Sequence, residues 1–170
     1  MANIKISNAR LSFPSLFNKA EFNGQVGKYE ATLLFPKSDK KTYDAVMKGI
    51  EACKKDNKIK VGADKLCIKD GDDIEYDGYA GMWAIKASNG KRPTVINRDK
   101  SPLVEEDEVI YAGCYVNAII DFWGQNNSYG KRVNANLLGV QFVKDGEPFG
   151  DGGKTADADE FDDIEDDDEY

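Results

Sequence analysis

The residues from Val109 to Trp123 alternate strictly between two kinds of side chain, and this run limits the fold more than any other feature. One face of the run is wholly apolar: Ile110, Ala112, Cys114, Val116, Ala118, Ile120 and Phe122. The other face mixes aromatic and polar residues with apolar ones: Val109, Tyr111, Gly113, Tyr115, Asn117, Ile119, Asp121 and Trp123. Because successive side chains of a β-strand point to opposite faces, the pattern predicts one long strand that covers a core on one side only.

Shorter strands and one helix are predicted around this run. Strands are expected over 4–13, 29–35, 81–87, 94–97 and 131–144. The apolar phase shifts between Ile6 and Leu11 and again near Leu137, as a β-bulge would cause. Apolar residues at helical spacing predict a helix that Ser38 caps and that ends near Lys55. The lysines on its opposite side suit either a solvated face or a subsidiary phosphate contact: Lys40, Lys41, Lys48, Lys54 and Lys55.

Several strands, two bulges and one helix between the early and middle strands fit a small closed barrel. We expect a mainly β, OB-fold-like five-stranded Greek-key barrel, an architecture that binds oligonucleotides across one strand face. The pattern alone also allows another small barrel or a sandwich.

The last twenty residues carry the chain's net charge. Residues 151–170 hold eleven of the 31 acidic side chains and one of the 23 basic ones, so residues 1–150 keep 22 basic and 20 acidic. Such a block cannot pack, because its charges repel and it has little apolar surface to bury. We therefore expect a globular domain over 1–150 and a disordered acidic tail over 151–170.

A polyanion beside a slightly basic domain imitates nucleic acid, which Lys and Arg bind largely by electrostatics. A purely solubilising tail is the alternative. The apolar and aromatic residues Phe161, Ile164 and Tyr170 favour a tail that binds a partner.

Composition argues against several other classes. The chain has no histidine, which removes the usual general base and the commonest metal ligand, so we expect no enzyme, metal or cofactor. Cys53, Cys67 and Cys114 are odd in number and widely spaced, which indicates reduced thiols in a cytoplasmic protein. We expect no signal peptide or membrane span, because the first residues have no long apolar run and no stretch approaches membrane length.

Aromatic and basic residues coincide in three places, as binding to single strands requires: rings on which bases stack, and cations for the backbone. The candidate DNA-binding residues are Tyr79, Trp83, Lys86, Lys91, Arg92, Arg98, Lys100, Tyr111, Tyr115, Trp123, Tyr129, Lys131 and Arg132. Core packing is the alternative for each aromatic, above all for Trp83, which shares its phase with Ile85. The basic residues in turns are alternatively just solvated.

Six segments resemble a family of bacteriophage single-stranded DNA-binding proteins, first catalogued as a domain of unknown function and later assigned an OB-fold. The segments are 28–37, 92–95, 111–117, 130–135, 139–142 and 146–150. The resemblance implies binding of single-stranded DNA during phage replication, recombination or repair, in the host cytoplasm. The acidic tail is similar in kind to the tails of other phage and bacterial single-strand binders. We expect it to occupy the basic groove until DNA displaces it, and then to recruit replication or recombination enzymes.

Two other functions stay open at this point. A protein-interaction module whose tail mimics DNA would have the same charge distribution. An RNA-binding barrel would have the same stacking surfaces, because aromatic rings do not distinguish the two sugars. Monomer and dimer are both open, because the sequence has no heptad or other assembly signal.

Overall fold

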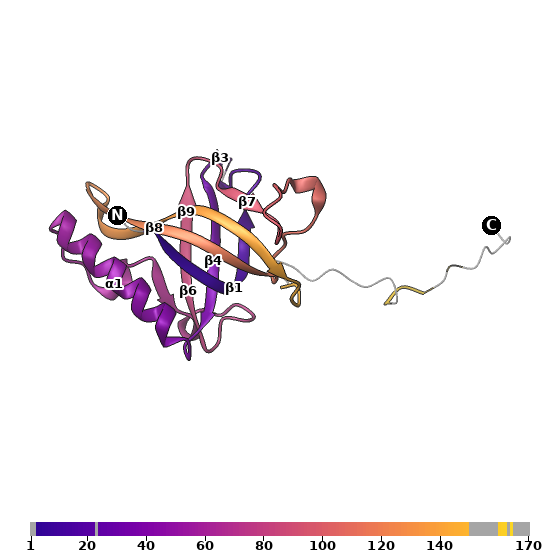
Figure 1. The fold of residues 1–170 in the computed structure, drawn as a ribbon, viewed down its shortest axis with the longest axis horizontal. Helices are drawn as coiled ribbons and strands as arrows, with labels where there is room; N and C mark the ends of the chain where they lie inside the picture. Colours follow the sequence, from indigo (N-terminus) through magenta and orange to yellow (C-terminus); the bar gives the residue numbers. More distant parts are fainter. Residues whose placement is uncertain (1–2, 23, 150–159, 163, 165–170) are drawn as a thin grey trace.

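The computed structural model describes residues 3–22, 24–149, 160–162 and 164 (Figure 1). Its strands are β1 (Ile4–Ser15), β2 (Glu21–Phe22), β3 (Gln25–Val26), β4 (Tyr29–Pro36), β5 (Ile68–Asp70), β6 (Met82–Asn89), β7 (Thr94–Ile96), β8 (Tyr115–Asn127) and β9 (Gly130–Lys144). The helix α1 spans Lys40–Asn57, and short 3-10 helices lie at Ala63–Lys65, Gly71–Asp73 and Glu105–Asp107. None of the helices in the described ranges is long and apolar enough to cross a membrane.

Five of the strands close into a barrel. Going round the ring, the order is β1, β4, β6, β9 and β8, and β8 returns to β1. All of these neighbours are antiparallel except β6 and β9, which run parallel. The short strands β5 and β7 extend the sheet beside β6 and β9. This arrangement confirms the expected OB-fold-like five-stranded barrel, with α1 between its second and third strands in chain order.

Alternating residues of the five strands fill the barrel. Leu11, Leu33, Ile85, Ile120 and Leu137 come from the five different strands, and all are fully buried. Both predicted bulges are present as register shifts, one between Ile6 and Ala9 and one opposite the step from Ile119 to Ile120. The bulges bend long strands, which lets five of them close a ring.

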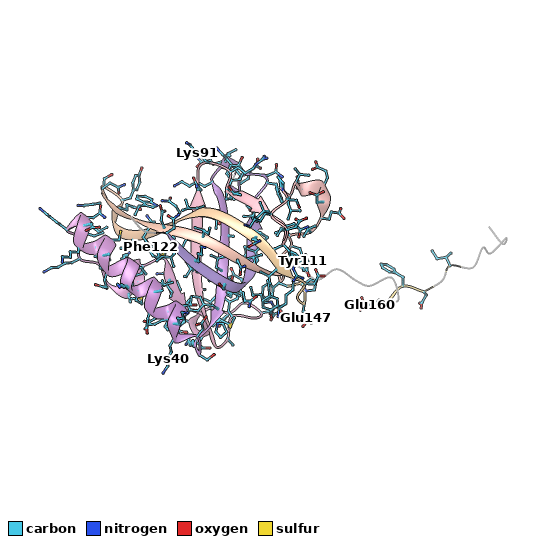
Figure 2. The ribbon with its side chains drawn as sticks, viewed as in Figure 1. Lys40, Lys91, Tyr111, Phe122, Glu147 and Glu160 are labelled. Carbon is cyan, nitrogen blue, oxygen red and sulfur yellow. The ribbon has the colours of Figure 1, made fainter. Side chains whose placement is uncertain are left out.

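The helix α1 packs across one end of the barrel (Figure 1). Its buried residues Val46, Ile50 and Cys53 belong to the barrel core. Figure 2 labels Phe122 between the barrel and the helix, where a Cβ built on Gly49 would lie 2.6 Å from the ring. The prediction of Ser38 as the helix cap is wrong. Asp39 is the cap, because its carboxylate accepts hydrogen bonds from both the backbone N–H and the hydroxyl of Thr42.

The predicted boundaries of the strand over 109–123 are also wrong. The strand β8 begins at Tyr115, because Gly113 adopts φ +109° and turns the chain before it. It also continues past Trp123 to Asn127, pairing with β9 through the polar residues 124–127. These Gly and Asn residues look like a turn in the sequence, but the reversal itself occupies only Ser128 and Tyr129.

The chain after β9 folds back against the barrel as far as Phe149. We call this contact the C-terminal clasp: residues 145–149 held by Arg10, Tyr111 and Gly113. The Arg10 guanidinium donates to the carbonyl of Glu147 at 2.6 Å and lies 3.9 Å from the ring centre of Phe149. The Tyr111 hydroxyl lies 2.9 Å from the Asp145 carboxylate and accepts from the N–H of Gly146.

Candidate nucleic-acid interface

An open groove of about 920 Å³ crosses the outer face of the barrel. Its lining comes from the outward residues of β4 and β6, from β8 and β9 near their hairpin, and from the stretch 66–79. Alternation along the strands produces this face, because residues such as Ala87 and Val133 point inward while their neighbours point out. The groove therefore lies on the strand face that OB-folds use for oligonucleotides.

The groove is rich in cations. Lys28, Lys69, Lys86 and Arg132 line it, against the single acidic residue Glu30. The Lys86 ammonium lies 3.4 Å from the Glu30 carboxylate, and this exposed pair contributes little to stability. Three of the four cations thus remain available to a polyanion without competition from Glu30.

Aromatic rings occupy both ends of the groove. Phe13 and Tyr76 meet edge to face with ring centres 5.0 Å apart, and Tyr76 meets Tyr79 at 5.4 Å. Trp123 lies at the other end, with the Lys28 ammonium 5.7 Å from its ring centre. The Tyr76 side chain is 57% exposed, so its ring is accessible from solvent.

The backbone at Phe13 is strained. It adopts φ +46°, in the left-handed region that side-chain-bearing residues rarely occupy, and its ring stays exposed. Strained residues cluster where a fold must place a side chain for binding. Phe13 also lines the groove, so the strained position places its ring there.

Four residues predicted from the sequence lie in this groove: Tyr79, Lys86, Trp123 and Arg132. Tyr79 forms part of the floor, since it is only 3% exposed and its hydroxyl shares a 2.7 Å hydrogen bond with Ser12. Tyr129 and Lys131 stand beside the groove at the tip of the β8–β9 hairpin, where Tyr129 is 88% exposed.

Trp83, Tyr111 and Tyr115 lie outside the groove. Trp83 stacks on Tyr43 of α1 with ring centres 4.8 Å apart, which agrees with the core-packing alternative. Tyr111 belongs to the C-terminal clasp. The Tyr115 ring lies 4.9 Å from the Lys144 ammonium, near the far ends of β8 and β9.

The remaining predicted cations also lie outside the groove. Figure 2 labels Lys91 on the turn after β6, well away from Tyr111. Arg92 donates to the carbonyl of Phe17 at 3.0 Å. Arg98 and Lys100 are exposed in the turn that follows β7.

Phe13, Lys28, Lys69 and Tyr76 line the groove but were not among the candidate DNA-binding residues, although Tyr76 belongs to the same aromatic and basic cluster as Tyr79 and Lys86. Tyr76 had a usable signal, because it sits three residues before Tyr79 in a Gly- and Asp-rich stretch. Lys28 directly precedes the alternating run of β4. Phe13 gave no signal, because only its backbone conformation turns its ring outward.

Among the described residues, the groove contains neither a reactive thiol nor a metal-binding cluster. Cys67 lines it, but burial raises the pKa of its thiol to about 12, so it is protonated and unreactive near neutral pH. Within the part of the chain that the structure describes, no group of three His, Cys, Asp or Glu side chains suits a metal ion.

The predicted tail lies mostly outside the described residues. Phe161 and Ile164 are described, and both side chains are exposed. Tyr170 lies outside the described residues.

Comparison with known proteins agrees with the fold. A curated relative, protein p50 of Acyrthosiphon pisum secondary endosymbiont phage 1, is 44% identical over 173 residues, which cover 95% of this chain and 93% of the relative. The structure of the single-stranded DNA-binding protein from bacteriophage Enc34 in complex with ssDNA matches with TM-score 0.79 and 41% identity, over 87% of this chain and 89% of that one. A C-terminal truncation of that protein matches with TM-score 0.78 and 42% identity, over 86% and 88% of the two chains.

The gp2.5 protein of bacteriophage T7, a single-stranded DNA-binding protein, is 12% identical with TM-score 0.60, over 92% of this chain and 99% of that one, and shares the fold alone. The sequence model of one family, described as Enterobacter phage Enc34, ssDNA-binding protein, matches residues 2–170. Three findings lead to one assignment: a barrel with this strand order, a cationic groove flanked by aromatic rings, and a match along almost the whole chain. The chain belongs to the family of the Enterobacter phage Enc34 ssDNA-binding protein.

Proposed function

We propose that the protein binds single-stranded DNA in the groove across β4, β6, β8 and β9, without reading its sequence. The observation that carries the proposal is the combination, in one groove, of exposed aromatic rings with four cationic side chains. Every base has a face that can stack, and every nucleotide has a phosphate, so this combination accepts any sequence. The Enc34 relative in complex with ssDNA supports the same ligand.

Within the groove, Phe13, Tyr76 and Trp123 are the proposed stacking residues, and Tyr79 supports Tyr76 from below. Lys28, Lys69, Lys86 and Arg132 are the proposed phosphate contacts, with Tyr129 and Lys131 beside them on the hairpin. The predicted contacts outside the groove stay predictions: Trp83, Lys91, Arg92, Arg98, Lys100, Tyr111 and Tyr115.

The proposed role is to cover single strands exposed during phage DNA replication, recombination or repair. A protein of this kind needs to hold every strand that these processes expose, which suits binding through stacking and phosphates. We propose no catalytic step.

The acidic tail is proposed to compete with DNA for the groove. The C-terminal clasp supports this, because Phe149 packs in one cluster with Tyr79 and Ile74, which line the groove. Phe149, the last described residue before the tail, thus lies near the Tyr76 end of the groove. The twenty residues of the tail span up to about 65 Å when extended, which is enough to reach along the groove. Once displaced by DNA, Phe161, Ile164 and Tyr170 would be available to replication or recombination enzymes.

Fluorescence anisotropy with labelled oligothymidine tests both proposals. The full chain and residues 1–150 should bind, with affinity that falls steeply as salt rises, because phosphate contacts release counterions. Removal of residues 151–170 should tighten binding most at low salt, where screening is weak. Equal affinities at every salt concentration would remove the competition proposal alone.

Failure of residues 1–150 to bind DNA would contradict the groove proposal and favour a protein-interaction module based on the tail. A matched RNA oligomer belongs in the same experiment. Binding of RNA more tightly than DNA would assign the groove to RNA instead.

A further inference from the structure

A second basic surface lies at the C-terminal end of α1, outside the groove. We call it the lysine corner: Lys54, Lys55, Lys58 and Lys60, which surround an open hollow of about 600 Å³. Lys54 pairs with Glu51 at 2.9 Å. The other three are exposed, and none forms an ion pair with a carboxylate among the described residues.

Helix capping does not explain these lysines. Cationic side chains near a helix C-terminus often bond its last carbonyls. Here the backbone N–H groups of Lys58 and Ile59 bond the carbonyls of Lys54 and Lys55 instead. The ammonium groups of Lys55, Lys58 and Lys60 are therefore available to another ligand.

Lys58 occupies a position that favours glycine. It adopts φ +54° and ψ +42°, the left-handed conformation in which a helix usually ends with Gly or Asn. A lysine here is less favourable for folding than a glycine would be. Its charge is a reason to have lysine at this position.

The lysine corner adjoins the Arg132 end of the groove. A Cβ built on Gly124 would lie 2.7 Å from Cγ of Asn57, so the last residue of α1 touches the strand just before the groove residue Gln125. The chain then runs from the corner to Leu66, which bridges Val133, the neighbour of Arg132. Figure 1 shows this end of α1 beside the β8–β9 hairpin.

The opposite end of the groove has the other sign of charge. Four exposed acidic residues flank Tyr76: Asp72, Asp73, Glu75 and Asp77. A polyanion longer than the groove is repelled at that end and attracted at the other. Among the described residues, the lining of the corner also includes no aromatic ring, so it suits phosphates rather than bases.

We propose that the lysine corner extends the DNA site, by holding phosphates of nucleotides that lie beyond the groove at its Arg132 end. The inference rests on the proposed function of the groove. It gives the bound strand a direction of exit, past the base of the β8–β9 hairpin and onto the end of α1.

The test compares two charge-matched variants of the full chain. Lys58→Gln with Lys60→Gln removes two charges from the corner. Lys40→Gln with Lys41→Gln removes two exposed charges from the other end of the same helix, roughly 26 Å away at 1.5 Å per residue. Figure 2 labels Lys40 at that far end.

Affinities are measured for oligothymidines from about 4 to about 30 nucleotides, a range that brackets the site of one OB-fold. The corner variant should match wild type on the shortest strands and bind the longest about fivefold more weakly at low salt. On long strands, the slope of its log binding constant against log salt concentration should be less steep by about 1.4. Each lost phosphate contact on a single strand removes about 0.7 from that slope. The control variant should match wild type at every length.

Lys58→Gly distinguishes an effect of the lost charge on binding from an effect of the substitution on folding. This variant should raise the Tm by about 2 °C, because glycine relieves the backbone strain, and still weaken binding to long strands. An unchanged affinity for long strands in the corner variant, or an equal loss at all lengths, would overturn the extension. Binding of short strands by wild type reports separately on the groove.

Discussion

The two tryptophans of the chain lie in different surroundings, which allows each to be followed by its fluorescence. Trp123 lines the groove, whereas Trp83 stacks on Tyr43 against α1. Since a stacked base quenches an indole it contacts, DNA should quench the emission of Trp83→Phe as it does that of wild type. Trp123→Phe should lose most of the quenching.

Trp123→Ala should weaken binding by about 1–3 kcal/mol, the usual value of one stacked base. Anisotropy with a short oligothymidine measures this loss. Trp83→Phe serves as the control, because it keeps a ring against Tyr43. If Trp83→Phe loses the quenching instead, the stacking site lies on the α1 side of the barrel.

The three cysteines should be almost inert in the folded protein. Burial raises the pKa of all three thiols, that of Cys67 to about 12, so at pH 8 each is protonated more fully than a free cysteine. Since the thiolate is the reactive form, a disulfide reagent should modify them slowly in the native state and rapidly in denaturant. Fast modification of one native thiol, located by mass spectrometry, would contradict this.

At the level of elements, the contact between α1 and β8 depends on one glycine. Gly49→Ala removes the helix penalty of glycine, worth about 1 kcal/mol, but its Cβ would meet the buried ring of Phe122. Overpacking of this kind costs about 1–3 kcal/mol, so the variant should be less stable in urea denaturation. In the Phe122→Leu background, Gly49→Ala should cost less stability than it does in wild type. An equal cost in the two backgrounds would refute the contact.

Two ion pairs connect the end of β4 to the end of β5 and to the loop between β5 and β6. Lys37 lies 2.6 Å from both Asp70 and Asp72, and the Asp72 carboxylate accepts from the N–H of Gly81. The hydrogen bond from Lys37 is the main cause that lowers the pKa of both carboxyl groups below 3.8.

A lowered pKa in the folded state stabilises the fold above the unfolded value near 3.8 and stops doing so as the pH falls through the folded value. Asp72→Asn should therefore be less stable than wild type at pH 7, and the difference should shrink below pH 4. Urea denaturation at several pH values measures it. A difference that is constant with pH would show that the charge of Asp72 is not its source.

The elements that periodicity could reveal were predicted, and those without periodicity were not. The alternation in β4 and the phase shifts near Ile6 and Leu137 were visible in the sequence. The strands β2, β3 and β5 have two or three residues, too few for a pattern. The start of β8 was misplaced because alternation continues through Tyr111, although Gly113 turns the chain.

The site was only partly predictable, because barrel closure assembles it from distant segments. Residues 13, 28, 76, 86, 123 and 132 come together in space although they are far apart in the chain. Lys86, Trp123 and Arg132 were predicted because each follows or precedes other aromatic or basic residues. The role of Tyr111 in the C-terminal clasp depends on Asp145 and Gly146, over thirty residues away.

At the scale of the whole molecule, the parallel pairing of β6 with β9 has a consequence for the order of events during synthesis. The strand β9 is the last of the barrel to leave the ribosome, and it alone joins β8 to β6. Until it emerges, the nascent chain has an open sheet with two exposed edges, and the groove lacks the wall that carries Arg132. The complete groove therefore forms in a single late step, and a ribosome stalled before residue 130 displays a chain without it.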